Sequence, residues 1–384
     1  MLEISFWAGL GILVYTYFGY PVVLFLAHKM FGRGSLVPEQ VGPLPRVTMI
    51  IAAYNEGKVI SSKLDNCLVL DYPADKIDFI VASDGSADAT NAIVSARAGA
   101  EPRLRLLALP RGGKAAAINA AMGEAKGDIV VFSDANTLYD AASIKNLVRH
   151  FSAERVGCVC GRLSYRNPGE VVSGKGESAY WRYETALKKM ESRLGYVAGA
   201  NGAIYAIRRA LFEPLPPGTI NDDFMISMRI VRRGFLCLYD ESAVAFEEVA
   251  PDVGSEFRRH VRDGAGHYIA VSRLTALLSP ALGTRAFIYW SHRIFRWSAP
   301  FILVLLLAVN AALADAQPYF VLFALQLAFY ALALLGYAAS AFGRMPFFIY
   351  VPFYFANLNL ALLLGFFRAV SGAARPAWES TQRN

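Results

Sequence analysis

The chain has 384 residues and a formal net charge of +7, and 55% of its residues are hydrophobic. This length allows two or three folding units, and the apolar fraction excludes a largely disordered chain. The positive charge does not indicate nucleic-acid binding, because basic residues gather at 258–262 and 285–296 near apolar segments, where they suit anionic lipid headgroups. No zinc-finger, RNA-binding or helix-turn-helix pattern occurs. We therefore expect membrane lipids, and no nucleic acid, as partners.

An uncharged apolar run at residues 4–27 opens the chain. About 20 such residues in a helix cross a bilayer core of roughly 30 Å, so residues 1–30 are predicted to form a transmembrane helix. A cleaved signal peptide is the alternative, but it should begin with basic residues, whereas Glu3 is the only charge before the run. Three basic residues follow the run: His28, Lys29 and Arg33. The positive-inside rule then places the next domain in the cytoplasm.

A Gly/Pro-rich linker at 31–46 leads into a region at 47–253 in which apolar strand-like runs alternate with helical patterns. Strands are predicted at 47–54, 78–83, 104–109, 128–133 and 156–163, with helices at 57–70, 86–98, 113–125 and 140–152. Strands that are apolar on both faces and separated by helices favour a mostly parallel α/β sheet, which binds ligands outside the carboxyl ends of its strands. The four cysteines lie in apolar contexts without metal-binding spacing, so we expect them to pack in the core.

The later part of the chain is less regular until it becomes apolar again. Helices are predicted at 176–193, from Asn221 to about 233 and at 254–278, with strands within 197–207 and at 235–239. Apolar segments follow at 298–314, 319–342 and 346–367. We predict interfacial helices at 254–297, about three transmembrane helices at 298–370 and a tail at 371–384. Four crossings would leave the C-terminus outside, whereas the basic tail favours the inside, so one segment is re-entrant or interfacial.

Polar turns follow the strands of the predicted sheet. The turn Ala53-Tyr54-Asn55-Glu56 lacks the GxGxxG glycines of dinucleotide sites, and its small alanines let a base lie close to the backbone. Asp84 can accept a hydrogen bond from a pyrimidine ring N–H; a plain Asx turn or a helix N-cap is the alternative. The backbone N–H groups before Lys114, in Arg111-Gly112-Gly113-Lys114, can meet a diphosphate or a base; a simple glycine turn is the alternative.

Two further turns carry carboxylates. Asp134 and Asn136 follow the most apolar strand, and side chains two residues apart point the same way in an extended chain. Their hard oxygen atoms suit Mg²⁺ or Mn²⁺. Asp222 and Asp223 begin a predicted helix, where acidic residues are common for helix-dipole reasons alone. Two adjacent carboxylates also raise the pKa of one of them, which suits a general base.

As an ordered set, the motifs AAYNE, SDGSADAT, RGGKAAAIN, FSDANT, GANGAIYAIRR and NDD resemble those of membrane-bound family 2 glycosyltransferases. That group includes cellulose, hyaluronan and poly-N-acetylglucosamine synthases. The resemblance implies a GT-A (Rossmann-like) nucleotide-sugar domain with transmembrane helices. It implies nucleotide binding, usually of UDP, at Ala53, Tyr54, Glu56, Asp84 and Lys114. It further implies a metal at Asp134 and Asn136 in place of a DxD motif, a base at Asp223 beside Asp222, and an acceptor-facing loop from Gly199 to Gly202.

The family's QxxRW motif is incomplete in this chain. The matching segment is Arg259-His260-Val261-Arg262-Asp263, in which Arg262 matches while the glutamine and the tryptophan are missing. We expect Arg259 and Arg262 to hold the departing diphosphate. The missing tryptophan, which would stack near the acceptor, favours single-sugar transfer as the alternative to polymer synthesis.

The expected activity is inverting transfer of a sugar from a nucleotide-sugar, with UDP as the expected nucleotide, to a saccharide acceptor in exopolysaccharide or cell-surface glycan synthesis. One alternative is transfer of a single sugar to a polyprenyl-phosphate or other lipid acceptor. A non-catalytic nucleotide-binding transporter or receptor is the other, and the lack of intramembrane charges disfavours it. We expect a multi-pass protein of the inner (cytoplasmic) membrane with a cytoplasmic catalytic domain, Mg²⁺ or Mn²⁺ as cofactor, and export proteins as candidate partners.

Overall fold

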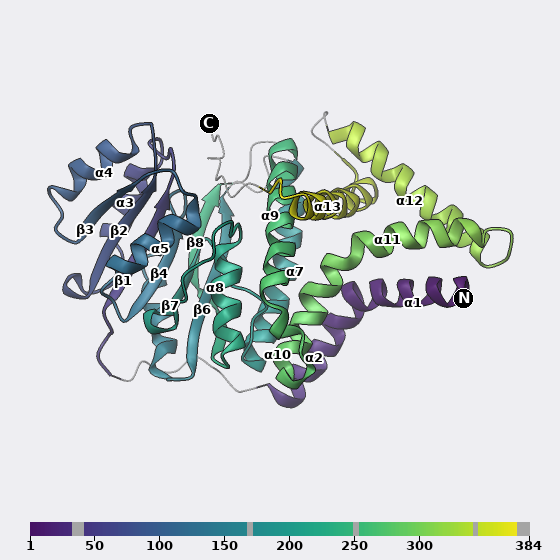
Figure 1. Ribbon diagram of the computed structural model, residues 1–384, viewed down its shortest axis with the longest axis horizontal. Coiled ribbons are helices and arrows are strands. Elements are labelled where there is room, and N and C mark those ends of the chain that lie inside the picture. Colours follow the sequence, from purple (N-terminus) through teal and green to yellow (C-terminus); the bar gives the residue numbers. More distant parts are fainter. Residues whose placement is uncertain (33–41, 167–171, 249–252, 341–344, 375–384) are drawn as a thin grey trace.

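The computed structural model describes residues 1–32, 42–166, 172–248, 253–340 and 345–374. Within these ranges a sheet domain lies at one end of the molecule and a group of long helices extends from the other (Figure 1). Much of the predicted linker and most of the predicted tail lie outside the described residues.

An eight-stranded sheet forms the centre of the domain, in the order β3-β2-β1-β4-β7-β6-β8-β5. Its strands are β1 (Val47–Ala53), β2 (Ile77–Asp84), β3 (Leu104–Leu109), β4 (Ile129–Asp134), β5 (Leu138–Tyr139), β6 (Val156–Arg166), β7 (Tyr205–Arg208) and β8 (Leu236–Glu248). Strands β1 to β4 run parallel to one another, and β6 runs parallel to β8. By contrast, β7 runs antiparallel to both β4 and β6, and β5 runs antiparallel to β8. The predicted mostly parallel α/β sheet is confirmed. The two-residue β5 was not predicted, and β8 is much longer than expected.

Helices cover both faces of the sheet because successive strand residues point to opposite sides. In β1, Ile50 belongs to the core cluster that includes residues of α5 (Lys114–Glu124) and α8 (Asp222–Arg232). The next residue, Ile51, belongs to the opposite cluster, with residues of α3 (Ile60–Leu68), α4 (Thr90–Ala98) and α6 (Ser143–Val148). All four cysteines are buried and unpaired, which confirms the prediction that they pack in the core.

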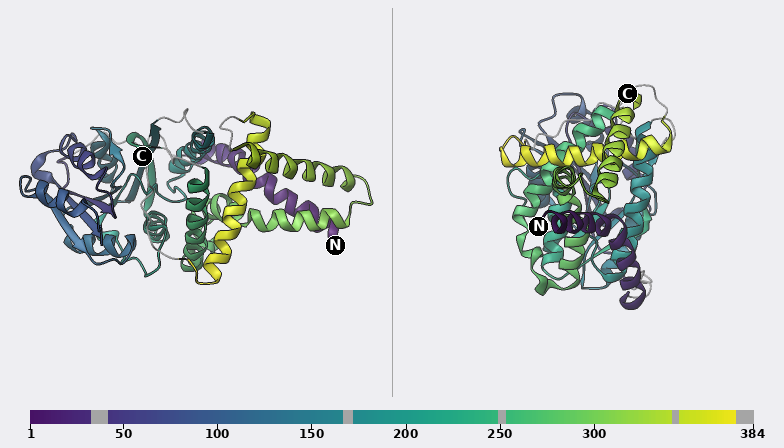
Figure 2. Two further views of the ribbon diagram at one scale, coloured as in Figure 1. Left: turned by 90° about the horizontal axis from the view of Figure 1, so that it is seen from above. Right: turned by 90° about the vertical axis from the view of Figure 1, so that its right-hand side faces the viewer.

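Three apolar helical segments run side by side away from the sheet (Figures 1 and 2). They are α1 (Leu2–Val14), which continues through η1 (Tyr15–Gly19) into α2 (Tyr20–Phe31), α11 (Phe295–Ala312) and α12 (Tyr319–Ala339). A small buried cluster of Phe6, Leu306 and Tyr319 joins the three. Among the described residues, four helices are long and apolar enough to cross a membrane: Leu2–Phe31, Thr284–Ala312, Tyr319–Ala339 and Phe347–Val370.

The last of these, α13 (Phe347–Val370), lies crosswise to the other three (Figure 2). It packs against α9 (Val253–Arg273), and glycines permit the close approach, since a Cβ atom on Gly365 would lie 2.7 Å from the backbone nitrogen of Ala265. The structure thus distinguishes α13 from the other apolar segments by its direction. The sequence had left open which of the apolar segments would not cross in the same way as the others.

A layer of helices stands between the sheet and the apolar helices (Figure 1). It contains α9 and α7 (Val172–Leu194). The expected helix at 254–278 ends at Arg273, and the short turns η5 (Thr275–Leu278) and η6 (Pro280–Leu282) follow it. The chain then enters α10 (Thr284–Ile288) and η7 (Tyr289–Ile294), which continue into α11. The remaining short turns are η2 (Ala74–Lys76), η3 (Arg149–Ser152) and η4 (Arg209–Leu211).

Candidate active site

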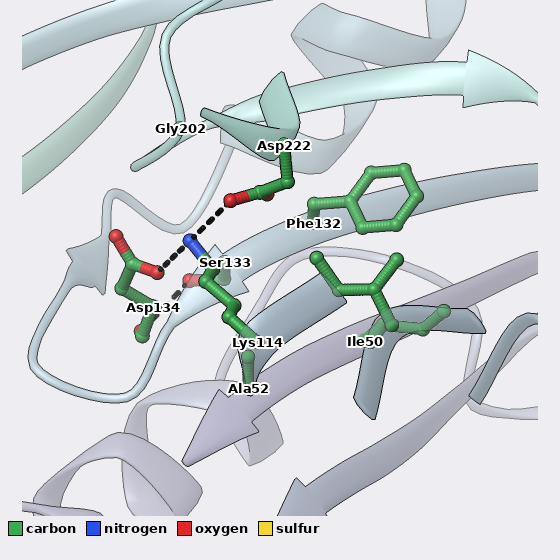
Figure 3. A pocket seen from close by; sticks show the side chains of 9 residues that line it. Ile50, Ala52, Lys114, Phe132, Ser133, Asp134, Gly202 and Asp222 are labelled. Carbon is green, nitrogen blue, oxygen red and sulfur yellow. Dashed lines mark hydrogen bonds and ion pairs between the residues drawn. The ribbon is translucent and has the colours of Figure 1, made fainter. Parts of the chain in front are cut away.

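A small pocket opens at the carboxyl ends of β1 and β4 (Figure 3). Its lining consists of Ile50, Ala52, Lys114, Ile118, Phe132, Ser133, Asp134, Gly202 and Asp222. These residues come from two central strands, the start of α5, the loop before β7 and the start of α8. The structure therefore brings together three predicted site residues that lie far apart in the chain: Lys114, Asp134 and Asp222.

The ammonium group of Lys114 joins two carboxylates across this pocket (Figure 3). Its Nζ atom lies 2.8 Å from Oδ1 of Asp134 and 3.2 Å from Oδ1 of Asp222. Burial disfavours the charged amine, but the two carboxylates outweigh that cost and hold the pKa of Lys114 above its ordinary value. Lys114 is therefore charged, and in this structure the two carboxylates balance its charge.

Asp223 lies at the start of α8, beside the loop that precedes β7. Its Oδ1 accepts a hydrogen bond of 2.8 Å from the backbone N–H of Phe224, and a Cβ atom on Gly202 would lie 3.2 Å from its Oδ2. Burial and the neighbouring Asp222 carboxylate raise the pKa of Asp223 to about 6. A carboxylate with this pKa is mostly ionised at neutral pH and still accepts a proton readily, which suits a general base.

The predicted helix start at Asn221 is confirmed, but the side chain of this residue does not cap the helix. Asn221 occupies the N-cap position of α8, but its side chain forms no capping hydrogen bond. Instead its Nδ2 donates to the backbone carbonyl of Asp263, 3.1 Å away on α9. The side chain therefore ties α9 to the end of α8 that carries the two aspartates.

Asp84 organises the glycine turn in front of α5. Its carboxylate, at the end of β2, is only 1% exposed and accepts hydrogen bonds from the backbone N–H groups of Gly112 and Gly113, at 2.7 and 2.9 Å. It also pairs with the guanidinium of Arg111, 2.5 Å away, which lies over the ring of Tyr54 at 3.3 Å from the ring centroid. Three predicted nucleotide-binding turns thus form one unit. A direct contact of Asp84 with a base stays a prediction.

The two remaining residues predicted to bind the nucleotide lie at the end of β1. Ala53 is fully buried in the core cluster on the α3 side of the sheet, whereas the preceding Ala52 lines the pocket. The backbone N–H of Glu56 donates to Oγ1 of Thr90 at 2.8 Å, which ties this turn to the start of α4. Strand alternation therefore makes Ala52, rather than Ala53, the alanine whose side chain faces the pocket.

The predicted metal site gains a carboxylate that the sequence did not reveal. Nδ2 of Asn136 donates to Oε1 of Glu247, 3.0 Å away near the end of β8. Among the described residues, no group of three His, Cys, Asp or Glu side chains could hold an ion by itself. Two carboxylates and an amide oxygen nevertheless fit Mg²⁺ or Mn²⁺, because such ions commonly complete their shells with water and substrate phosphates. The Glu247-Glu248 pair at a strand end was the available signal.

A buried lysine supports the turn that carries Asp134 and Asn136. Lys63 of α3 is fully buried, and its Nζ donates to Oγ of Ser133 at 2.7 Å and to the carbonyl of Thr137 at 2.5 Å. Burial lowers the pKa of Lys63 to about 8, against the opposing influence of nearby Cys67 and Asp134. The sequence signal was weak, because a single lysine in an amphipathic helix usually faces solvent.

The predicted diphosphate-binding arginines lie on α9, and neither lines the pocket. Arg262 pairs with the neighbouring Asp263 at 3.1 Å. An aromatic group does stand near the start of α8, but it comes from another element: Trp297 of α11 stacks on His267 at 4.4 Å and lies 5.3 Å from the ring of Phe224. The roles predicted for Arg259 and Arg262 stay predictions.

Comparison with known proteins agrees with this geometry. Residues 48–215 match the sequence family Glycosyl transferase family 2. The chain therefore contains a glycosyl transferase family 2 domain, and the glycosyltransferase class predicted from the motifs is confirmed.

Two curated relatives show how far the sequence likeness extends. One is a beta-monoglucosyldiacylglycerol synthase of Trichormus variabilis, 28% identical over 198 residues, which cover 50% of this chain and 42% of the relative. Another is a poly-beta-1,6-N-acetyl-D-glucosamine synthase of Staphylococcus aureus, 24% identical over 237 residues, which cover 61% of this chain and 57% of the relative. The chain therefore spans only about half the length of these relatives.

A solved structure resembles nearly the whole chain. The mannosyltransferase PcManGT from Pyrobaculum calidifontis, in complex with GDP-Man and Mn²⁺, superposes with a TM-score of 0.72. The comparison covers 96% of this chain and 99% of that one at 23% sequence identity. This likeness concerns the fold, and it confirms the predicted GT-A-like architecture.

Proposed function

We propose that the protein is an inverting glycosyltransferase that moves a sugar from a nucleotide-sugar to a saccharide acceptor at the membrane, in exopolysaccharide or cell-surface glycan synthesis. The observation that carries the proposal is the position of a carboxylate with a raised pKa, Asp223, directly beside the Lys114 cluster at the strand ends. A base for the acceptor then lies behind Gly202, at the edge of the pocket that holds a cation for the leaving group.

In the proposed reaction the Asp223 carboxylate takes the proton of an acceptor hydroxyl as the hydroxyl oxygen attacks the anomeric carbon. The bond from that carbon to the diphosphate oxygen breaks, and the nucleoside diphosphate leaves with the electron pair. General-base assistance of this kind is worth about 10²–10⁴-fold in rate. Lys114 offsets the negative charge that develops on the leaving group.

A divalent cation would be held by Asp134, Asn136 and Glu247. When bound, such an ion neutralises charge on the diphosphate. The residues of the chain prepare this position themselves, because Lys63 holds both ends of the turn that carries the first two ligands. The Mn²⁺ in the mannosyltransferase complex supports a divalent ion, and Mg²⁺ is the other candidate.

The donor base is proposed to lie near the Tyr54–Arg111 stack. The motif resemblance favours UDP, while the mannosyltransferase neighbour carries GDP-Man. An arginine fixed over an aromatic ring offers a flat cationic surface, which either kind of base can use. Both nucleotides therefore belong in the experiment.

We further propose that three helical segments cross the inner membrane, namely α1–α2, α11 and α12, while α13 lies at the cytoplasmic surface. The crosswise direction of α13 and its packing on α9 support this arrangement. Lys29 follows the first crossing, and two further crossings, α11 and α12, lie between it and Arg368. Both basic residues are then on the cytoplasmic side, as the positive-inside rule requires. Protease digestion of a C-terminal tag in inverted and right-side-out vesicles tests this topology.

A second candidate is transfer of one sugar to a lipid or polyprenyl-phosphate acceptor. The missing tryptophan after Arg262 supports it, as does the lipid product in the name of the beta-monoglucosyldiacylglycerol synthase relative. Three crossing helices also leave little material for a polymer channel within one chain.

The test uses membranes that contain the full chain, radiolabelled UDP-N-acetylglucosamine, UDP-glucose and GDP-mannose, and the Asp223→Asn variant as control. Label is counted separately in polymer, lipid extract and free monosaccharide. Polymer or oligosaccharide label that depends on Asp223 supports the first candidate, and label confined to the lipid extract supports the second. Donor binding without turnover of any donor would favour a non-catalytic transporter or receptor.

A further inference from the structure

A buried network of charged side chains connects α7 with the apolar helices. Glu191 of α7 is fully buried, and its Oε1 accepts a hydrogen bond of 2.6 Å from the hydroxyl of Tyr20 on α2. The same oxygen lies 2.5 Å from Nδ1 of His292 in η7. Nε2 of His292 lies 3.2 Å from Glu184 of α7, which also pairs with Arg296 of α11. The network thus joins α7 to the first two apolar helical segments, namely α1–α2 and the helix that contains η7 and α11.

The network also holds the backbone of one residue, Ala198, in the loop that leads to the pocket. Oε2 of Glu191 accepts a hydrogen bond of 3.0 Å from the backbone N–H of Ala198. Nε of Arg293 donates to the backbone carbonyl of the same residue at 2.6 Å. Both polar backbone groups of Ala198 are therefore bound by charged side chains, one from α7 and the other from η7.

The residues after Ala198 pack directly on the turn that carries the proposed base. Gly199 has a φ of +103°, and a Cβ atom there would lie 2.7 Å from the ring of Phe224. The backbone N–H of Ala200 donates to Oγ of Ser227 at 3.0 Å, and that hydroxyl donates to the carbonyl of Asp223 at 2.7 Å. Gly202 then lies against the Asp223 carboxylate and lines the pocket. Movement of Ala198 would therefore be transmitted to the surface beside the base.

We propose that Glu191 and Arg293 are positioning residues that fix the loop 199–202 over Asp223 and tie its position to the apolar helices that bear Tyr20 and His292. The inference rests on the proposed function, because the loop is taken to border the acceptor. It assigns to this network a part in acceptor use and none in donor binding.

The charges of the network are costly to bury, and an apolar core of the same volume is often as stable. A role in stability alone therefore explains the network poorly. Directional bonds to the backbone of a single residue explain it better, since hydrogen bonds from charged groups are the stronger and more specific ones. Because Arg293, Tyr20 and His292 belong to the apolar helical segments, the loop keeps all of these contacts only when those helices are in position.

The test compares two buried arginines that are three residues apart. Arg293→Met removes the donor to the Ala198 carbonyl, Arg293→Lys retains an amine donor, and Arg296→Met removes a cation of the same network whose ion pair is with Glu184. Hydrogen exchange is measured for peptides across 195–204 and across the sheet. Sugar label from UDP-N-acetylglucosamine, UDP-glucose and GDP-mannose is divided into transferred and hydrolysed fractions in the same membranes.

We expect Arg293→Met to speed exchange in 198–202 by about 10- to 100-fold, the loss that follows removal of a hydrogen bond from a charged group. Hydrogen exchange in β1 and β4 should stay unchanged. The ratio of transfer to hydrolysis should fall by about tenfold. Nucleotide-sugar affinity should stay within about twofold of the parent, because the substitution does not touch the donor turns. Arg293→Lys should recover most of the ratio, and Arg296→Met should leave both the loop exchange and the ratio near those of the parent chain.

Equal acceleration of exchange throughout the sheet, or equal effects of Arg293→Met and Arg296→Met, would overturn the proposal and leave the network a purely structural one. An unchanged ratio with a loosened loop would also overturn it. If the parent chain turns over no donor, the proposed function fails, while the exchange measurement still decides whether the two side chains hold the loop.

Discussion

The proposed donor side and the proposed acceptor side of the pocket are built in different ways. On the donor side, Tyr54, Asp84 and Asp134 each stand within one residue of a strand end, and neighbouring turns of the same sheet hold them. On the acceptor side, the loop at Ala198 depends on side chains from α7 and η7, and through Glu191 on Tyr20, which is 171 residues away in the chain. The proposed donor half is therefore held by the sheet and the helices that cover it, whereas the proposed acceptor half also depends on side chains from the apolar helices.

The sharpest way to break the acceptor side is Asp223→Asn. Loss of the base should lower the rate of transfer by about 10²–10⁴-fold. Nucleotide-sugar affinity, measured by calorimetry on the detergent-purified chain, should remain unchanged because the donor turns are intact. Turnover near the parent level would show that another group accepts the proton.

On the donor side, Glu247→Gln tests the carboxylate from β8. We expect affinity for Mn²⁺ to fall by about 10–100-fold, as for other changes next to metal ligands. Free Mn²⁺ is measured by electron paramagnetic resonance on the purified chain. The matched control is Glu248→Gln, one residue further along β8 and exposed. Equal losses in the two variants would point to charge alone and argue against a ligand role for Glu247.

The pH dependence separates the two sides without a substitution. Because Asp223 must be ionised to accept a proton and its pKa is raised to about 6, kcat/KM should be constant above that value. Below it, kcat/KM should fall by about tenfold for each pH unit as the carboxylate is protonated. Donor binding should not follow the same curve. A plateau that extends down to pH 4 would exclude Asp223 as the base.

The smallest effect on turnover is expected from Lys63→Met, which tests the support of the metal-binding turn. The change leaves the buried carbonyl of Thr137 without this donor, so the free energy of unfolding should fall by about 1–3 kcal/mol. Thermal unfolding of the purified chain measures the loss. The exposed Lys58→Met is the control, and it should stay within about 0.5 kcal/mol of the parent. Equal unfolding temperatures for the two variants would show that the turn at 133–137 is stable without the hydrogen bonds from Lys63.

Sequence reasoning placed Tyr54, Asp84 and Asp134 correctly at strand ends, because each of them lies at or directly after the end of an apolar strand. The four parallel strands lie within a few residues of their predicted bounds, and the turns after three of them meet at one edge of the sheet. It recovered Asp222 and Asp223 for a similar reason, since a first helical turn is a local feature. It missed Lys63 and Glu247, whose roles come from contacts about 70 and 111 residues away in the chain.

The sequence by itself determined the fold class, the family, the polar turns and the presence of four apolar segments, because strand alternation, helix periodicity and segment length are properties of neighbouring residues. Only the tertiary structure decided that Asn221 bonds to α9, that α13 lies crosswise to the other apolar helices, and that Glu191 and Arg293 hold Ala198. These features depend on which distant surfaces pack together, and a linear pattern does not specify the partner of a buried polar group.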